Sequence, residues 1–468
     1  MSFGVAGRNT RSSESERSIS PAPSPVSVRI YEEADIGGFV VHTRDILGGR
    51  LTGREVELKG WIHRTRTVGG KAFVVVRDAT GIVQVTIAKG EVRPDAFEAA
   101  EKAGIESSVI VFGTVVTDAR APGGYEVRAT DVRIVHPAES FPITEDLSEE
   151  FLLDVRHLWV RSQKMAQVFR VRHTVFGAVH EYFREQGFWE VHPPMIMPAG
   201  SEGGATLFEL DYFGRKAYLT QSWQLYAEAL ALSMEKVYYI GPSFRAEKSR
   251  TTRHLTEYWH AEMEEAWAGM DDVLKHAEAV VSHACQRAAE ANPGEVRALG
   301  RDPGFLKAVK PPFERIRYDE ALNVLRSKGL EIPWGKDLRT EEERLLTEGK
   351  TKPIIVTHYP KVSQPFYKAR DPENPDLVLA FDVIAGDGVG ELVGGSEREA
   401  DLETLRRSLL AQGEDPKAYE WYLDTRRYGS VQHAGFGMGM ERLIQWICKL
   451  DHIRDTVPFP RTPARFAP

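Results

Sequence analysis

Residues 244–265 read FRAEKSRTTRHLTEYWHAEMEE and carry a charged centre between apolar, strand-like ends. The pattern predicts two β-strands joined by a charged loop. An arginine fork in such a loop can hold a phosphate or a carboxylate through paired hydrogen bonds, and carboxylates can bind amino groups or Mg²⁺. A surface hairpin with salt bridges has the same composition, so the stretch by itself leaves both interpretations open. Its charged members are Arg245, Glu247, Arg250, Arg253, His254, Glu257, Glu262 and Glu264.

The chain around this hairpin, from residue 161 onward, mixes strand and helix signals without regular alternation. The spacing of apolar residues predicts a long amphipathic helix over 163–186, and strands are predicted over 379–386 and 390–399. These signals favour an α+β domain around a largely antiparallel sheet, over 161–468. The sequence has no Walker loop and no G-x-G-x-x-G after a strand, so ATP would need another kind of site.

A different pattern precedes this domain, in which short segments alternate apolar and polar residues as β-strands do. The segments are residues 54–66, 71–78, 81–90, 107–119 and 124–137, and a helix is predicted over 94–106, between the third and fourth. Five strands with a helix in that place are typical of an OB-fold, a small β-barrel that often binds single-stranded nucleic acid. We therefore predict a multidomain chain with an OB-fold over 29–138 and a linker over 139–160. Residues 1–28, rich in Ser and Pro, are expected to be disordered.

Composition indicates a soluble globular protein, with 468 residues of which 42% are hydrophobic and 27% charged. The net charge of −8 argues against a protein that coats nucleic acid through a basic face, so any contact with RNA must be local. No apolar run approaches the length of a membrane span, and we expect a cytoplasmic protein. Cys285 and Cys448 are expected to be buried thiols rather than a disulfide or metal ligands.

A glycine-rich segment near the C-terminus, HAGFGMGMERLIQWICKL at 433–450, leads into an apolar helix with Arg442 in its first turn. Closely spaced glycines let a ligand approach the backbone, and an arginine beside them suits phosphate. A tight strand-to-helix connection with a surface arginine would have the same sequence pattern. Taken alone, this motif is weak.

Together with FREQGFWEVHPPMI at 183–196, the two motifs resemble motifs one, two and three of the class II aminoacyl-tRNA synthetases, in the right order. The resemblance covers nearly everything from Arg54 to Pro468. It implies that motif one, ending at Pro194, builds a homodimer interface. It also implies that Arg245 holds the α-phosphate of ATP and Arg442 the γ-phosphate. The implied ATP-binding residues are Arg245, Glu247, Arg253, His254, Leu255, Tyr258, Glu391, Gly439 and Arg442, and the implied catalytic ones are Arg245, Glu247, Glu391 and Arg442.

The implied reaction forms an aminoacyl adenylate. Attack by the amino-acid carboxylate adds negative charge at the α-phosphorus, and a fixed arginine together with Mg²⁺ would stabilise that charge without a general base. By the same resemblance Glu391 is the Mg²⁺ ligand.

The barrel placed before the catalytic domain narrows the resemblance to the aspartate, asparagine and lysine subgroup. GWIHRTRTVGGKAFVVVRDATGIVQV, at 60–85, resembles an anticodon-binding barrel. The resemblance implies that Phe73 stacks on an anticodon base, that Gln84 reads a base edge, and that Arg64 or Arg66 meets backbone or base. Such stacking contributes about 1–3 kcal/mol per base. Strand alternation alone leaves open that Phe73 is a barrel-core residue.

Residues 201–232, SEGGATLFELDYFGRKAYLTQSWQLYAEALAL, resemble the amino-acid pocket of this subgroup. Aspartyl enzymes have a lysine where Ala227 stands, followed here by Glu228. An acid at Glu228 could accept a hydrogen bond from an amide NH₂ and would repel a carboxylate, although the side chain could instead face solvent. The segment VGELVGGSERE at 389–399 has Gly394 where archaeal aspartyl enzymes tend to have serine. The implied amino-acid-binding residues are Glu202, Gln224, Glu228, Arg245, Tyr367 and Arg398, with Asp382 a further pocket residue.

The favoured function is therefore a ligase that uses ATP to join L-asparagine to tRNA(Asn). The alternatives are an aspartyl enzyme of relaxed tRNA choice, an asparagine synthetase on the same catalytic domain, and a non-catalytic RNA-binding paralogue. A hydrolytic editing site is not expected, because a hydrogen-bonding pocket can separate an amide from an acid. Two residues depart from the pattern: Trp223 could crowd the pocket entrance, and Thr252 replaces an arginine that could contact tRNA or phosphate.

Overall fold

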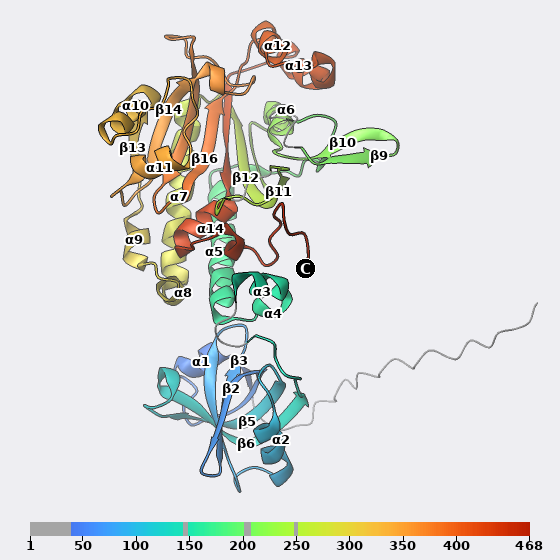
Figure 1. Cartoon of the computed structure of the whole chain (residues 1–468), viewed down its shortest axis with the longest axis vertical. Coiled ribbons are helices and arrows are strands. Elements are labelled where there is room, and N and C mark those ends of the chain that lie inside the picture. The colour runs from blue at the N-terminus through green and yellow to red at the C-terminus, as the bar shows by residue number, and fades with distance from the viewer. Residues whose placement is uncertain (1–38, 144–147, 201–206, 248–250) are drawn as a thin grey trace, which may run out of the picture. The chain divides into compact units, whose positions relative to one another are not determined.

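The computed structural model describes residues 39–143, 148–200, 207–247 and 251–468 (Figure 1). They divide between Phe141 and Pro142 into two compact units. The extension expected to be disordered, 1–28, lies outside the described residues, as does the predicted site residue Glu202. No helix within the described ranges is long and apolar enough to cross a membrane.

The first unit is a closed barrel. Its sheet has the order β1-β2-β3-β4-β6-β5, and β2 also pairs with β5, which closes the barrel. The barrel strands are β2 (Glu55–Val68), β3 (Lys71–Arg77), β4 (Ile82–Ala88), β5 (Ser108–Thr117) and β6 (Tyr125–His136), with α2 (Pro94–Lys102) after the third. Alternate apolar residues such as Val56, Leu58 and Val74 fill the interior, as the period of two requires. The predicted OB-fold is confirmed.

Two short elements precede the barrel strands and were not predicted. They are β1 (Phe39–Val41), which pairs parallel with β2, and α1 (Thr43–Leu47). Asp78 fixes α1 to the barrel, because its carboxylate accepts from the backbone N–H of Thr43 at 2.8 Å and from its hydroxyl at 2.8 Å. Helix α2 is also shorter than predicted and ends at Lys102, since Ala103 is extended.

The second unit is built around an eight-stranded sheet with the order β13-β14-β15-β16-β17-β12-β11-β7. Figure 1 labels β11, β12, β13, β14 and β16 of this sheet. All neighbours are antiparallel except the outer pairs β13–β14 and β11–β7, so the predicted α+β domain with a largely antiparallel sheet is confirmed. The strands are β7 (Trp189–Glu190), β11 (Lys236–Phe244), β12 (Glu257–Ala266), β13 (Glu314–Arg317), β14 (Ile354–Pro360), β15 (Leu377–Ala385), β16 (Gly390–Glu397) and β17 (His433–Gly439). A smaller sheet contains β8 (Ile196–Met197), β10 (Arg215–Leu219) and β9 (Glu209–Tyr212).

Three long or apolar helices form the main core against this sheet. They are α5 (Gln163–Glu185), α7 (Met270–Ala291) and α14 (Met440–Cys448), and the predicted long helix is α5. Its buried valines recur at helical spacing and pack with sheet residues such as Tyr238 and Phe436. Cys285 on α7 and Cys448 on α14 are both buried and free, as expected of structural thiols. The remaining helices are α6 (Gln224–Met234), α8 (Pro293–Ala298), α9 (Pro303–Ala308), α10 (Tyr318–Ser327), α11 (Thr340–Thr347), α12 (Leu402–Ala411) and α13 (Glu420–Arg427).

The predicted linker, 139–160, contains two short helices, α3 (Glu149–Asp154) and α4 (Arg156–Trp159). The Arg156 side chain is buried and donates to the backbone oxygens of Arg454 at 3.0 Å, Val457 at 2.7 Å and Pro458 at 2.8 Å. These bonds fix α4 to the C-terminal segment. The later part of the predicted linker is therefore folded as part of the second unit.

Candidate active site

The charged hairpin predicted from the sequence is formed by β11 and β12, which pair from Lys236 opposite Glu265 to Phe244 opposite Glu257. Arg245 continues β11, and its backbone N–H donates to the Thr256 oxygen at 3.0 Å. Its guanidinium lies 5.9 Å from the centre of the Tyr258 ring. The hairpin therefore presents an arginine and an aromatic ring side by side on the surface of the sheet.

A first cavity, open to solvent and with about 710 Å³ of space not occupied by atoms, lies beside this hairpin. Every residue that the sequence predicted to bind ATP lines it, together with others from β12, β16, α14 and the C-terminal segment. The lining residues are Arg245, Glu247, Arg253, His254, Leu255, Thr256, Tyr258, His260, Glu391, Leu392, Gly437, Gly439, Glu441, Arg442, Ile453 and Pro463. Motifs far apart in the sequence thus meet in one space.

The charge of this cavity comes from its arginines rather than from its histidines. Burial, with nearby Arg442 and Arg253, lowers the pKa of His254 to about 4, and burial with Arg245 lowers the pKa of His260 to about 3. Both rings are therefore neutral at neutral pH. The positive charge that an anion such as a polyphosphate would meet therefore comes from Arg245, Arg253 and Arg442, and Glu247, Glu391 and Glu441 add negative charge to the same lining.

Arg442 is held in place from two sides. Its guanidinium donates to the backbone oxygen of Glu391 at 2.8 Å and lies 3.3 Å from Nε2 of His254, which accepts as a neutral ring. It belongs to the first turn of α14, whose N-cap is Gly439. The glycine-rich segment therefore forms a strand-to-helix turn that directs an arginine into the first cavity.

A second cavity of about 660 Å³ adjoins the first, and Arg245 and Glu391 line both. Of the residues predicted to bind the amino acid, Gln224, Arg245, Tyr367 and Arg398 line the second cavity. Its full lining is Ser222, Gln224, Ala227, Arg245, His260, Glu262, Met263, Glu264, Tyr367, Lys368, Asp382, Glu391, Gly394, Gly395, Arg398, Phe436 and Gly437. A group shared between the cavities would lie beside Arg245 and Glu391.

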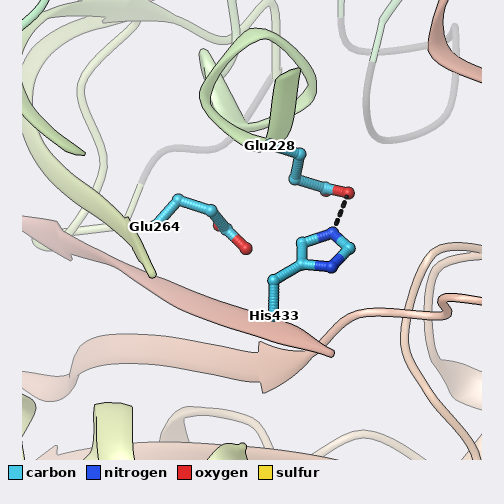
Figure 2. A group of neighbouring side chains, drawn as sticks. All are labelled: Glu228, Glu264 and His433. Atoms are coloured by element: carbon cyan, nitrogen blue, oxygen red, sulfur yellow. Dashed lines mark hydrogen bonds and ion pairs between the residues drawn. The ribbon is translucent and has the colours of Figure 1, made fainter. Parts of the chain in front are cut away.

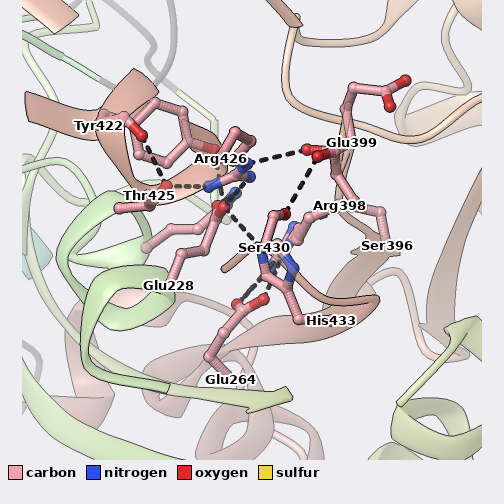
Figure 3. A network of polar contacts seen from close by, with 12 residues as sticks. Glu228, Glu264, Ser396, Arg398, Glu399, Tyr422, Thr425, Arg426, Ser430 and His433 are labelled. Carbon is pink, nitrogen blue, oxygen red and sulfur yellow. Dashed lines mark hydrogen bonds and ion pairs between the residues drawn. The ribbon is translucent and has the colours of Figure 1, made fainter. Parts of the chain in front are cut away.

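Arg398 is fixed at the wall of the second cavity (Figure 3). It donates to both carboxylate oxygens of Glu264, at 3.0 and 2.9 Å, and to the Ser396 hydroxyl at 2.8 Å. Its guanidinium also lies 5.5 Å from the ring centre of Tyr367. Glu264 was not among the predicted binding residues, although its alternation with Glu262 along a strand was a signal that both could face one cavity.

Glu228 is fully buried on α6, so the alternative in which it faces solvent is wrong. One oxygen accepts from the Gln224 amide at 2.9 Å. The other accepts from the Tyr422 hydroxyl at 2.7 Å and from the Arg426 guanidinium, and it lies 3.0 Å from Nε2 of His433. Among the described residues of α6 it is Gln224 and Ala227, and not Glu228, that line the second cavity. Glu228 therefore reaches the lining through its hydrogen bond from Gln224 and through the action of its charge on Arg398.

His433 lies between Glu228 and Glu264, and the possible ligand atoms of the three residues lie within 4.8 Å of one another (Figure 2). Such a trio could hold a metal ion, but both carboxylates are already neutralised, by Arg426 and Arg398 (Figure 3). Both nitrogens of His433 also face oxygens, since Nδ1 lies 2.8 Å from the Val431 backbone oxygen. We interpret the trio as part of a buried ion network.

A second group of carboxylates lies at the junction of the cavities and suits a divalent cation better. Asp382 on β15 and Glu391 on β16 flank Gly394, where an added Cβ would lie 2.7 Å from Oε1 of Glu391 and 3.4 Å from Oδ1 of Asp382. Burial and the neighbouring Glu391 raise the pKa of Asp382 well above its usual value. Carboxylate oxygens that repel one another across an open position fit a hard divalent cation.

The predicted anticodon residues share one outer face of the barrel. Strand register places Arg64 opposite Val75 and Val75 opposite Gln84, and in the next row Arg66 opposite Phe73. Ala72, Val74 and Val76 point inward and are buried, whereas Phe73 is half-buried on the outer side, so the alternative of a core Phe73 is wrong. The Arg66 guanidinium lies 4.8 Å from the Phe73 ring centre. Gln84 donates to buried Glu126 at 2.9 Å.

Neither departure from the family pattern lines a cavity, but each is hydrogen-bonded to a residue that does: Trp223 to Glu262 and Thr252 to Ile453. Trp223 is buried under α6 with its ring 5.5 Å from that of Tyr239, and it is absent from the described lining of both cavities. The predicted crowding of the pocket entrance is therefore not found. Thr252 is exposed, and its backbone oxygen accepts from the Ile453 N–H at 2.9 Å.

The antiparallel sheet, the arginine-lined cavity and the preceding barrel together define a class II aminoacyl-tRNA synthetase. Residues 148–463 match the family described as tRNA synthetases class II (D, K and N), and residues 56–135 match the OB-fold nucleic acid binding domain. An asparagine–tRNA ligase from Thermococcus gammatolerans is 50% identical over 418 residues, which cover 89% of this chain and 97% of that protein. One from Thermoplasma acidophilum is 47% identical over 416 residues, with the same coverage. The chain belongs to the asparagine–tRNA ligase family.

Solved structures support membership of the same family. The asparaginyl-tRNA synthetase of Pyrococcus horikoshii complexed with asparaginyl-adenylate has a TM-score of 0.89 and 48% identity, covering 92% of this chain and 99% of that one. The Entamoeba histolytica asparaginyl-tRNA synthetase in complex with asparaginyl-adenylate has a TM-score of 0.84 and 31% identity, with the same coverage.

Proposed function

We propose that the protein activates L-asparagine with ATP in the two adjoining cavities and transfers it to tRNA(Asn). The outer face of the barrel binds the anticodon of this tRNA. The observation that carries this proposal is that Arg245 and Glu391 line both cavities. ATP bound in the first cavity and asparagine bound in the second would bring the α-phosphorus and the amino-acid carboxylate together beside one arginine. This proximity lowers the entropic cost of the reaction.

In the first step a carboxylate oxygen of asparagine attacks the α-phosphorus, and the bond to pyrophosphate breaks. Arg245 stabilises the added negative charge, and Arg442 holds the outer phosphates and so positions the leaving pyrophosphate. Tyr258 offers a ring for the adenine to stack on. In the second step a hydroxyl at the end of the tRNA attacks the acyl carbon, and AMP leaves. The adenylate thus forms and reacts in one place, with Glu247, Arg253, His254, Leu255 and Gly439 as further contacts of the nucleotide.

A divalent cation, which we take to be Mg²⁺, fits the carboxylates at the junction of the cavities. Glu391 and Asp382 would hold it. When bound, it supplies positive charge that offsets the phosphates of ATP. Gly394 supports this assignment, because a side chain at that position would enter the space between the two carboxylates.

The choice of asparagine over aspartate follows from the charges around Arg398. Its guanidinium is already paired with both oxygens of Glu264, so an incoming carboxylate finds no uncompensated cation there. An amide oxygen can still accept from it without adding charge. The position of Ala227 supplies no lysine to meet a carboxylate, and Lys368, the one lysine in the described lining, donates to the Gln364 amide oxygen at 2.6 Å. Gln224 offers polar groups to the amino-acid backbone. The carboxylate of aspartate would add a second negative charge beside Arg398, whose charge Glu264 already balances.

Pyrophosphate exchange into ATP, measured with asparagine and aspartate supplied separately and without tRNA, tests this proposal. We expect exchange with asparagine and about 10⁴-fold weaker exchange with aspartate, since a hydrogen-bonding site discriminates strongly between such analogues. Equal exchange with aspartate would favour an aspartyl enzyme of relaxed tRNA choice. No exchange with either would favour a non-catalytic RNA-binding protein.

The barrel face is tested separately by Phe73→Ala. Loss of one stacked base should weaken tRNA binding by about 1–3 kcal/mol, raising the KM for tRNA about 5- to 150-fold while exchange without tRNA stays unchanged. Aminoacylation assays with varied tRNA(Asn) measure both effects. Phe112→Ala is a matched control, because Phe112 is a half-buried, outward residue of β5. An equal loss in both variants would show damage to the barrel rather than loss of a stacking platform.

We also propose that the protein forms a homodimer through motif one and that it is located in the cytoplasm. The motif-one segment, 183–196, includes Trp189 and Ile196, which precede and follow Pro194 in the sequence and are both exposed apolar residues of this unit. These residues support an interface with a second copy, as the resemblance implies.

A further inference from the structure

The stretch between β13 and β14, to which the sequence assigned no role, brings a buried carboxylate into contact with two residues that line the first cavity. Helix α11 begins at Thr340 and carries a run of glutamates. Glu341 is largely exposed, whereas Glu343 is 6% exposed and turned toward the sheet. The charge of a glutamate this deeply buried is stable only beside a group of opposite charge or hydrogen-bond donors.

The partner is Arg253 of the motif-two loop. The guanidinium of Arg253 forms an ion pair with Oε2 of Glu343, donates to the Thr340 hydroxyl at 2.7 Å, and donates to the Val389 backbone oxygen at 3.3 Å. Both side chains of the pair are more than nine-tenths buried. Helix α11 therefore holds the motif-two loop by one of its arginines.

The other oxygen of Glu343 has a different partner. Oε1 accepts from the backbone N–H of Glu391 at 3.3 Å. Glu391 lines both cavities, and Glu343 lines neither within the part of the chain that the structure describes. One carboxylate thus connects an arginine of the nucleotide cavity with the backbone of the proposed metal ligand.

Gly390 makes this arrangement possible. Its φ is +78°, and a Cβ there would lie 2.0 Å from Nη1 of Arg253 and 2.3 Å from Oε2 of Glu343. A side chain at this position would displace the ion pair, and the positive φ would strain the backbone as well. The chain therefore has a glycine, Gly390, where β16 lies against the Arg253–Glu343 ion pair.

We infer that Glu343 is a positioning residue of the ATP site, which holds Arg253 and the backbone of Glu391 where the nucleotide requires them. The inference rests on the proposed function of the first cavity. Without Glu343, the guanidinium of Arg253 is freed from its buried pair and Glu391 loses one constraint on its backbone. The asparagine side of the site, at Arg398 and Gln224, has no contact with this pair in the described residues and should be unaffected.

Glu343→Gln separates this role from a structural one, because glutamine keeps an oxygen for the Glu391 N–H. The substitution removes the negative charge and replaces the oxygen that accepts from Arg253 by an NH₂ donor. We expect the KM for ATP to rise about tenfold and the Mg²⁺ concentration for half-maximal exchange to rise with it, while the KM for asparagine changes less than twofold. Pyrophosphate exchange measures all three. Glu341→Gln, on the exposed side of the same helix, is the matched control and should behave like the unchanged protein.

A second pair of variants keeps the test decisive if Glu343→Gln folds poorly. In an Arg253→Gln background, Glu343→Gln should not raise the KM for ATP further, because the two residues act through one contact. A lowered melting temperature with unchanged KM for ATP, or independent effects of the two substitutions, would overturn the inference. Failure of the proposed function is distinct, since the unchanged protein and Glu341→Gln would then show no asparagine-dependent exchange.

Discussion

Arg245→Met is expected to lower kcat/KM for asparagine-dependent pyrophosphate exchange by about 100- to 1000-fold, the loss typical of one removed charge stabiliser in a transition state. Arg245 lies where the two cavities meet, so its charge acts on the phosphorus as the carboxylate attacks. Most of the loss should be in kcat, because that charge develops only in the transition state. Steady-state exchange with varied ATP and asparagine measures the two constants.

Two further variants test whether the loss of activity in Arg245→Met is due to the guanidinium group of Arg245. Arg245→Lys should recover only part of the rate, since an ammonium group cannot make the paired contacts of a guanidinium. Arg326→Met removes an exposed arginine of α10, far from the charged hairpin in sequence, and should leave exchange unchanged. Full activity of Arg245→Met would refute the role given to this arginine. A rise in the KM for ATP alone would limit that role to binding.

Arg426→Met is expected to destabilise the second unit by about 3–5 kcal/mol, the cost of removing one partner of a buried ion pair. Arg426 and Glu228 are both fully buried, and the carboxylate would be left with fewer charges to balance it. Burial alone would raise the pKa of Glu228, but Arg426 and His433 outweigh burial and hold this pKa well below its usual value. Urea denaturation followed by circular dichroism measures the loss.

The pH dependence gives this prediction a second readout. A glutamate with a lowered pKa in the folded state stabilises the fold above its unfolded pKa of about 4.3, and this stabilisation is lost as the pH falls below that value. In Arg426→Met the buried carboxyl would instead take up a proton more readily in the folded state. The deficit of the variant should therefore be largest near pH 7 and shrink toward pH 5.

The neighbouring residue provides the control. Arg427 follows Arg426 on α13 but is more than one third exposed, and its partners Asp424 and Glu420 are exposed too. Arg427→Met should change the free energy of unfolding by less than about 0.5 kcal/mol. Glu228→Gln combined with Arg426→Met should regain part of the loss, because no charge is then left unpaired. Equal stability of Arg426→Met and the unchanged protein would show that Tyr422 and His433 suffice.

The sequence by itself determined the parts of this protein that depend on local pattern. Alternation of apolar residues defined the barrel strands and placed α2 after the third, and the charged centre of 244–265 defined the β11–β12 hairpin. The residues proposed to bind the nucleotide were predicted from the family resemblance, which two short motifs carry for most of them, and they line one cavity. A contiguous motif keeps its side chains together in any fold that preserves the turn.

Only the tertiary structure decided how the buried charges are paired. Glu228 meets Arg426 and His433 from 198 and 205 residues away, Glu264 meets Arg398 from 134, and Glu343 meets Arg253 from 90. Periodicity indicates whether a position faces inward, but it carries no information about which distant side chain lies opposite. That choice depends on sheet order and strand register, where a buried charge is stable only beside the opposite charge that the fold brings to it.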